Sequence, residues 1–227
     1  MLILALDAST PTIAVGLART EDRAEDEQRR MLAEVSVSAR GASETLLLAV
    51  HDVLELAGEE LGSVDLILTG TGPGTFTGIR IAAATARALS LGTGAELSAN
   101  STLAALAAPA LPVAGDVLAV IDARRGQVFA QRFTDAVPTR EIVCATPQDL
   151  RVDGRPLLVG DGAVRYREVL SRRGNIPPGD SPLHRVSAAG HVLSAALAVS
   201  DAEALVPIYV REPDAEVRRD LNPWSRR

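Results

Sequence analysis

Apolar runs of strand length open the chain. Residues 2–10 (LILALDAST) and 12–19 (TIAVGLAR) are almost continuously apolar and are separated only by Pro11, which predicts two buried strands joined as a hairpin. Residues 31–39 (MLAEVSVSA) alternate apolar and polar side chains and predict a third strand. The charged segment between the second and third predicted strands, residues 20–30, is interpreted as an exposed hairpin tip.

The pattern then changes to helical spacing. Apolar residues recur three and four positions apart between Leu46 and Ala57, which predicts a helix over residues 43–61 with Ser43 as its N-cap. The remaining elements predicted in this half are a strand over 64–70, a helix over 79–91, a strand over 95–100 and a helix over 101–110 that Pro109 and Pro112 end.

The second half repeats this order with different residues. We expect a hairpin over 116–134, a third strand over 140–145, a short helix over 146–152, a strand over 156–162, a helix over 163–174, and a last short strand and helix within 184–200. The segments LILALDAST and VLAVIDARR can be superposed, each with Asp followed by Ala. Two copies of one unit are therefore predicted.

The predicted fold class is α/β, with two tandem ribonuclease-H-like subdomains whose mixed sheets are flanked by helices. The subdomains are placed at residues 1–110 and 111–227, with the option that the C-terminal segment packs back on the first. Such a tandem pair is the architecture of the actin-like ATPase and sugar-kinase superfamily. This similarity of fold does not establish an activity.

Composition narrows the possible functions. The net charge is −6, divided as −8 in residues 1–121 and +2 in residues 122–227, so nucleic-acid binding by the chain alone is disfavoured. All 23 basic residues are arginine, which excludes a P-loop lysine or a Schiff-base lysine. The start of the chain lacks a basic signal region and no apolar run is long enough to span a membrane, so we expect a soluble, cytoplasmic protein.

A glycine-rich loop, GTGPGTFTG over residues 70–78, separates a predicted strand from a predicted helix. The dinucleotide fingerprint fails because Thr75 stands where glycine or alanine is required. The loop is interpreted as a turn in which Thr75 or Thr77 caps the helix, in preference to an anion site made by its amides.

The helix predicted after this loop has one face made mostly of small side chains. Ala82, Ala83, Ala86 and Leu89 lie on one side, which allows another helix to approach closely. A core contact with the helix over 43–61 explains part of this pattern. Because few polar side chains interrupt the helix, a buried subunit interface is also predicted.

Asp7, Ser9 and Thr10 form the one polar group at the end of the first predicted strand. A carboxylate beside two hydroxyls is able to orient magnesium and phosphate in a nucleotide cleft, and the same residues before a proline are also ordinary turn formers. Both interpretations stay open. No metal site or nucleophile is predicted from the other candidate residues, which are His51, His184, His191 and Cys144.

Several segments resemble one protein family. The stretches LALDAST, ASETLL, LTGTGPGTFTGIRIAAATARALSLG, STLAALA, IDARRGQVF and PIYVREPDAE are similar, in this order, to the bacterial TsaB (YeaZ) family of tRNA threonylcarbamoyladenosine biosynthesis proteins. These matches run from residue 2 to about residue 216. The segment GPGTFTGIR is specific to this family and to its catalytic paralogue TsaD.

The resemblance implies an actin-like fold without catalytic activity of its own. It implies pairing with TsaD, which with the ATPase TsaE and ATP modifies the adenosine next to the anticodon in tRNAs reading ANN codons. ATP and metal are then expected on TsaD and TsaE and no cofactor on this chain; tRNA is expected only through the complex, and a homodimer is possible for the chain alone. The paralogues are expected to meet through the helices over 43–61 and 79–91, at Leu47, Val50, Leu54, Ile79, Arg80, Ala82, Ala83, Ala86 and Arg87.

The resemblance also argues against chemistry in this chain. The catalytic paralogue carries a His-x-x-x-His metal pair where Ala42 and Leu46 stand here. Asp7, Ser9 and Thr10 match the first phosphate motif of the superfamily, but the second copy over 122–126 (DARRG) has arginines where small residues are usual. Nucleotide binding is therefore doubtful. We further hypothesise that a charged residue at Ala83 or Ala86 would abolish complex formation without unfolding the chain.

Alternative functions are an ATP-dependent phosphotransferase or ATPase using Asp7 and Asp122 as magnesium-orienting carboxylates, and a metallopeptidase, against which the missing histidine pair argues. The sequence leaves open whether the free chain is a homodimer. It also leaves open whether arginines of the second half, such as Arg124 and Arg125, contact tRNA.

Overall fold

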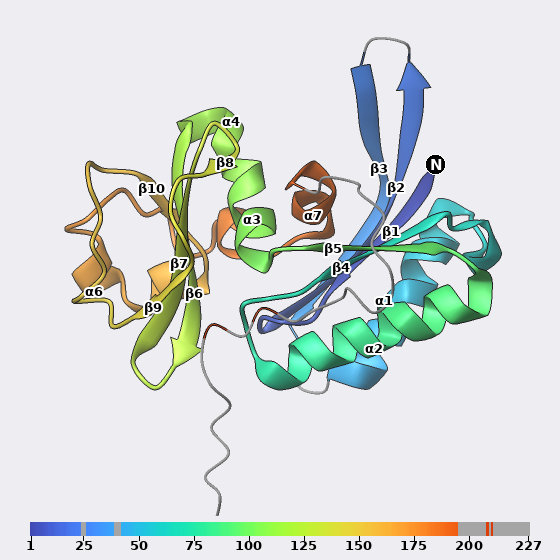
Figure 1. The fold of residues 1–227 in the computed structure, drawn as a ribbon, viewed down its shortest axis with the longest axis horizontal. Helices are drawn as coiled ribbons and strands as arrows, with labels where there is room; N and C mark the ends of the chain where they lie inside the picture. Colours follow the sequence, from blue (N-terminus) through green and yellow to red (C-terminus); the bar gives the residue numbers. More distant parts are fainter. Residues whose placement is uncertain (24–25, 39–41, 195–207, 209, 211–227) are drawn as a thin grey trace, which may run out of the picture.

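The computed structural model describes residues 1–23, 26–38, 42–194, 208 and 210, and contains two sheets placed side by side (Figure 1). The first sheet has the order β3-β2-β1-β4-β5. Its strands are β1 (Leu2–Asp7), β2 (Thr12–Arg23), β3 (Asp26–Ser38), β4 (Leu66–Gly70) and β5 (Glu96–Asn100). The central strand β1 pairs antiparallel with β2 and parallel with β4, so both of its edges are satisfied.

The β2–β3 hairpin is longer than the apolar pattern predicted. The two strands pair as far as Arg23↔Asp26, so most of residues 20–30 is strand and not hairpin tip. Since β1 pairs with β2 only as far as Arg19, the outer part of the hairpin projects beyond the sheet as a two-stranded ribbon (Figure 1).

Helices α1 (Ala42–Ala57) and α2 (Phe76–Thr93) pack side by side on one face of this sheet (Figure 1). Their inward residues join Leu4 and Leu6 of β1 in one apolar core. Helix α1 begins at Ala42, one residue before the predicted N-cap Ser43, whose side chain lies outside the described part of the structure. It ends before the predicted residue 61 because Gly58 has a φ of +66°, a left-handed conformation that terminates helices. A 3₁₀ turn, η1 (Leu61–Ser63), follows.

The opposite face of the first sheet is covered by α7 (Ala188–Ser194), from the C-terminal part of the chain. Ala188 and Val192 of α7 pack on Ile3, and Glu34 Oε1 accepts a hydrogen bond from Ala188 N at 2.7 Å. At the other end of the helix, the guanidinium of Arg29 donates to the carbonyl of Val192 at 2.7 Å. The first sheet therefore holds α7 at both ends as well as along its apolar side.

The second sheet has the order β10-β6-β7-β8, with β9 also pairing with β7. Its strands are β6 (Asp116–Arg124), β7 (Gln127–Thr134), β8 (Val137–Pro138), β9 (Val143–Ala145) and β10 (Leu157–Val159). Helix α3 (Thr102–Ala107) and the 3₁₀ turn η2 (Ala108–Ala110) pack on one face, followed by α4 (Leu111–Ala114). Helix α3 thus joins the core of the second sheet, while α7 joins that of the first, so the boundary at residue 110 stays a prediction.

Three predictions for the second half are wrong. Residues 146–152 form a turn and not a helix. The helix predicted over 163–174 is interrupted at Tyr166 and becomes α5 (Asp161–Arg165) and α6 (Arg167–Leu170). The strand expected near the start of 184–200 is absent from its described part, which begins with the end of the 3₁₀ turn η3 (Pro182–His184) and continues into α7. The α/β class with two mixed sheets flanked by helices is confirmed.

Candidate functional site

The glycine-rich loop packs on the turn between β1 and β2. Thr75 caps α2, accepting a hydrogen bond from Gly78 N at 3.3 Å, and its own amide donates to Ser9 O at 2.7 Å. A Cβ added at Gly78 would lie 1.9 Å from Ala8 O, so glycine is required for this close approach. Two amides at this junction, those of Thr75 and Gly78, are thus engaged within the protein, as expected of a turn that positions a helix.

Asp7, at the end of β1, is completely buried and fully hydrogen-bonded. Its Oδ1 accepts from Ser9 N at 2.6 Å, and its Oδ2 accepts from Thr102 Oγ1 and from His191 Nε2, both at 2.8 Å. Ser9, Thr102 and His191 are each 0% exposed. Because these bonds use both carboxylate oxygens, a magnesium ion or a phosphate would have to displace groups that hold the fold together.

His191 reaches this cluster from α7, and its neighbours determine how it bonds. Ser194 Oγ donates to Gly190 O at 2.8 Å and therefore accepts from Asn100 Nδ2 at 2.7 Å. The same Asn100 nitrogen lies 3.3 Å from His191 Nδ1, which acts as an acceptor. The proton of the imidazole is then on Nε2, directed at Asp7.

Burial raises the pKa of Asp7, but the hydrogen bonds from His191 and Ser9 outweigh it and hold this pKa below its ordinary value. Asp7 is thus a buried carboxylate stabilised by its neighbours. Of the three residues predicted to line a nucleotide cleft, Asp7 and Ser9 are inside the protein, and their role in nucleotide binding stays a prediction. Thr10 is half-buried, donates to Thr12 O at 3.0 Å and borders a cavity; its role in ligand binding stays a prediction.

The cavity beside Thr10 lies between the β1–β2 turn and the second half of the chain and has a volume of about 280 Å³. Asp161, Arg165 and Arg185 line its second-half side. Burial and the nearby charge of Asp122 raise the pKa of Asp161, while a hydrogen bond from Asp122 N partly opposes them. The cavity is therefore lined by one carboxylate and two arginines.

Helices α1 and α2 present an outer face that the small-residue pattern did not identify. Six of the nine predicted interface residues are buried in the chain's own interior, namely Val50, Leu54, Ile79, Ala82, Ala83 and Ala86. Their part in a partner contact stays a prediction, and the burial of Ala83 and Ala86 weighs against the hypothesis that a charge there would leave the fold intact. Leu47, Arg80 and Arg87 keep surface exposure and stay candidates for a partner contact.

The outer face carries large apolar side chains. On α1, Leu47, Leu48 and Leu56 are 54%, 64% and 70% exposed. On α2, Phe76 and Leu91 are 39% and 86% exposed, and the guanidinium of Arg80 lies 3.6 Å from the centre of the Phe76 ring. Sequence reasoning missed Leu48, Leu56, Phe76 and Leu91, although their apolar character on the polar side of each helical pattern is the signal that identifies them.

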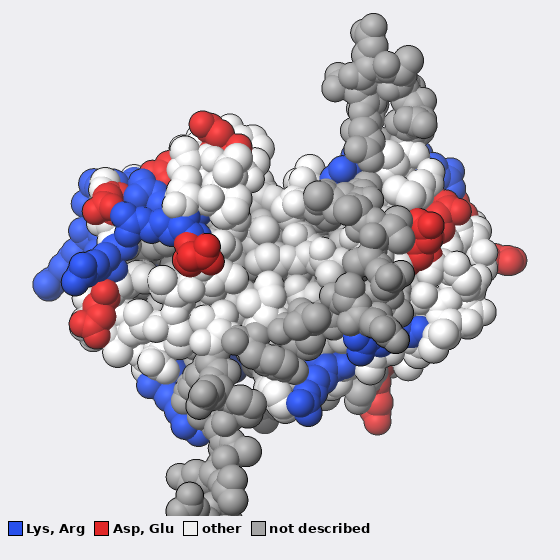
Figure 2. Space-filling model, viewed as in Figure 1, with Lys and Arg blue, Asp and Glu red and all other residues white. Residues whose placement is uncertain are grey.

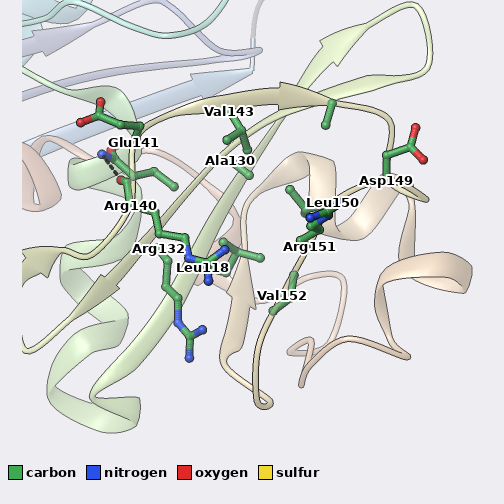
Figure 3. A pocket seen from close by; sticks show the side chains of 12 residues that line it. Leu118, Ala130, Arg132, Arg140, Glu141, Val143, Asp149, Leu150, Arg151 and Val152 are labelled. Atoms are coloured by element: carbon green, nitrogen blue, oxygen red, sulfur yellow. Dashed lines mark hydrogen bonds between the residues drawn. The ribbon is translucent and has the colours of Figure 1, made fainter.

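A second cavity, of about 260 Å³, lies on the face of the second sheet opposite α3 (Figure 3). Figure 3 shows Arg132 and Arg140 beside its apolar floor. Arg132 donates to both oxygens of Asp116, at 2.8 and 2.6 Å, and Arg140 pairs with Asp153. Since carboxylates neutralise these arginines, the cavity is poorly suited to an anion.

The histidines and the cysteine considered in the sequence analysis lie in three different kinds of environment. His184 is buried and its Nδ1 accepts a hydrogen bond from Gly160 N at 3.1 Å, His51 is exposed on α1, and Cys144 is half-buried in β9. Within the described ranges, no three His, Cys, Asp or Glu side chains are grouped as metal ligands would be. None of the helices in those ranges is long and apolar enough to cross a membrane.

Comparisons with known proteins point to one protein family. The sequence profile of TsaD, tRNA N6-adenosine threonylcarbamoyltransferase, matches residues 36–149. The tRNA threonylcarbamoyladenosine biosynthesis protein TsaB of Escherichia coli is 32% identical over 176 residues, which cover 71% of this chain and 72% of that protein. The chain belongs to the TsaB (YeaZ) family. The structure of YeaZ from Pseudomonas aeruginosa superposes with a TM-score of 0.75 at 27% identity, over 92% of this chain and 99% of that one.

Other TsaB-family relatives match along nearly the whole length. TsaB of Bacillus subtilis is 28% identical over 235 residues, which cover 96% of this chain and 97% of that protein. An uncharacterized protein of Mycobacterium bovis is 33% identical over 215 residues, covering 94% and 93%. The family assignment therefore extends to both halves of the molecule.

Proposed function

We propose that this protein is a non-catalytic subunit of the complex that forms threonylcarbamoyladenosine next to the anticodon of tRNAs reading ANN codons. It binds the catalytic paralogue TsaD through the outer face of α1 and α2. The observation that carries this proposal is the exposed apolar face of these helices in a chain whose relatives are named for threonylcarbamoyladenosine biosynthesis.

The exposed apolar side chains of the outer face are typical of a surface that a partner covers. Five of the ten large apolar side chains exposed in the described residues lie on α1 and α2. Because α1 and α2 pack against each other, their apolar side chains belong to neighbouring surfaces. Burying one exposed leucine or phenylalanine contributes about 1.5–3 kcal/mol at most, so this set is sufficient to anchor a specific contact.

The residues that occupy the superfamily's catalytic positions in this chain support a non-catalytic role. Asp7 is closed off by its bonds to Ser9, Thr102 and His191. Leu46, which stands where the resemblance places a metal-binding histidine of TsaD, is 0% exposed in the apolar core. Catalysis and the binding of ATP and metal are therefore assigned to TsaD and TsaE.

The proposed assembly has further parts. TsaE joins the pair as the ATPase, and the assembled complex binds tRNA. The modification of tRNA takes place in the cytoplasm. In the absence of TsaD, the same apolar face of α1 and α2 pairs with a second copy, because a self-complementary patch forms a two-fold dimer.

Mixing this chain with TsaD of the same organism tests the interface by size-exclusion chromatography with light scattering. We expect a heterodimer for the native chain and none for the variant Leu48→Glu/Leu56→Glu, since charges would be buried unpaired at the contact. Val113→Glu is the matched control, because Val113 is 84% exposed on α4. Co-elution of Leu48→Glu/Leu56→Glu with TsaD would place the interface elsewhere.

A further inference from the structure

Two arginines line the cavity between the two halves, and two more follow Asp122 in the chain. Arg165 ends α5 and Arg185 follows η3, while Arg124 ends β6 and Arg125 begins the turn to β7. The side chains of Arg124 and Arg165 are 58% and 59% exposed, and Arg125 and Arg185 are also exposed. Figure 2 shows arginine atoms at the end of the β6–β7 hairpin, on the lower left of the surface.

Two of these arginines lie beside one buried carboxylate. Arg124 Nη1 lies 3.4 Å from Asp122 Oδ2, and Arg165 Nε lies 3.6 Å from the same oxygen. Arg165 and Arg185 line the same cavity. The positive charges of the rim thus belong to one cluster, although they come from three separate segments of the chain.

The charges are arranged in two layers. The carboxylate of Asp122 is 4% exposed, and Asp161 lies beside it at the base of the cavity. Since solvent contacts the guanidinium groups of Arg124 and Arg165 and hardly reaches Asp122, an anion is attracted to the rim. An anion that entered the cavity would meet Asp161 and be repelled, so the site suits an extended polyanion lying across the rim better than a small enclosed one.

The backbone of the β6–β7 turn is unfavourable for arginine. Arg124 and Arg125 have φ values of +64° and +50°, in the left-handed region. That region is disfavoured for a residue with a Cβ, and glycine or asparagine would occupy it more easily. The turn therefore retains two arginines at a cost in stability, as is common at binding sites.

We propose that Arg124, Arg125 and Arg165 bind phosphate groups of the tRNA backbone, so that this chain contributes directly to tRNA binding within the complex. The inference rests on the proposed function for the identity of the RNA. The contacts are to the phosphate backbone and position the RNA without reading its bases. They also give the net-acidic chain a local positive surface for RNA.

The test measures binding of fluorescently labelled tRNA by the full-length chain, alone and with TsaD, between about 50 and 200 mM salt. The test variant is Arg124→Asn/Arg125→Asn, because asparagine tolerates the left-handed conformation and keeps the turn. The control is Arg151→Asn/Arg155→Asn, which removes the same charge from two exposed arginines elsewhere in the second half. Thermal unfolding of each variant confirms that it is folded.

Loss of two phosphate contacts should lower the slope of log affinity against log salt by about 1.4–1.8, and the affinity by tens of fold near 0.1 M salt. The control variant should bind like the native chain. An unchanged slope in Arg124→Asn/Arg125→Asn, an equal loss in the control, or no tRNA binding by the native complex would each overturn the proposal. Displacement of the tRNA by millimolar ATP would overturn it in favour of a mononucleotide site.

Light scattering on the same samples separates this inference from the proposed function. If the heterodimer with TsaD forms but the slope is unchanged in Arg124→Asn/Arg125→Asn, the arginine site is refuted and the scaffold role stands. If no heterodimer forms, the proposed function fails, and tRNA binding by the chain alone decides whether the arginines bind RNA.

Discussion

Removing His191 should destabilise the whole molecule, because this residue links α7 to the first strand through Asp7. In His191→Ala, the buried carboxylate of Asp7 would keep its bonds to Ser9 and Thr102 but lose the donor at 2.8 Å from Nε2. The mutation also leaves a cavity in a site where both partners are 0% exposed. The consequence is a buried carboxylate with one hydrogen-bond donor fewer.

The size of the effect follows from these contacts. Removing a hydrogen-bond donor from a buried carboxylate costs about 1.5–3 kcal/mol, a large share of a total stability of about 5–15 kcal/mol, and the cavity adds to this cost. For a chain of 227 residues, the loss of the hydrogen bond alone corresponds to a fall in Tm of about 3–12 °C. His51→Ala is the control, because His51 is 73% exposed on α1 and should change the free energy of unfolding by less than about 0.5 kcal/mol.

The assay is urea and thermal unfolding of four proteins: native, His191→Ala, Asp7→Ala and the double variant. The double variant should lose less than the sum of the single losses, with a coupling energy of about 0.5–3 kcal/mol. A His191→Ala protein as stable as the native one, or single losses that add, would show that the pair does not clamp α7 to the sheet.

The hydrogen bonds of Asp7 also predict how the free energy of unfolding depends on pH. The pKa of Asp7 is lower in the folded chain than its ordinary value of 3.8, so Asp7 stabilises the fold fully only above that value. This contribution is lost as the pH falls from about 4 through the pKa of the folded state. The free energy of unfolding of the native chain should therefore fall more steeply below pH 4 than that of Asp7→Asn, measured by urea titration; parallel curves would contradict the assignment.

Three other substitutions have defined outcomes. Gly78→Ala should cost about 1–3 kcal/mol in urea unfolding, because the new Cβ would lie 1.9 Å from Ala8 O; native stability would contradict the close approach. Asp161→Asn should stabilise the chain at pH 7, since the raised pKa of Asp161 means that its charge, beside Asp122, opposes folding there; a lower Tm would contradict this sign. Ala86→Glu should give unfolded or insoluble protein, because Ala86 is 0% exposed; a folded variant would contradict its burial in the core.

Local patterns predicted the strands and most helices well because they report burial and backbone preference. The superposition of LILALDAST on VLAVIDARR correctly anticipated two central strands, β1 and β6, in similar sheets. The helix expected over 146–152 did not form: Leu150 and Val152 contact the core from an irregular segment, and residues 147–149 form a turn. A pattern of seven residues is too short to distinguish these outcomes.

The candidate sites were harder to predict, because each depends on contacts distant in the sequence. Asp7 and His191 are 184 positions apart, and no local pattern indicates that one donates a hydrogen bond to the other. On α2, the small residues Ala82 and Ala86 correctly marked a face that another element covers, but that element is the chain's own core. Exposed apolar residues such as Leu91 are the better guide to a partner surface.

The most direct measurement is the threonylcarbamoyladenosine content of tRNA from cells depleted of this chain, determined by mass spectrometry of digested tRNA. We predict that the modified nucleoside falls on depletion, returns with the native chain and with Val113→Glu, and does not return with Leu48→Glu/Leu56→Glu. An unchanged level after depletion would contradict a role in this modification. Full recovery with Leu48→Glu/Leu56→Glu would contradict the α1–α2 face as the site of TsaD binding.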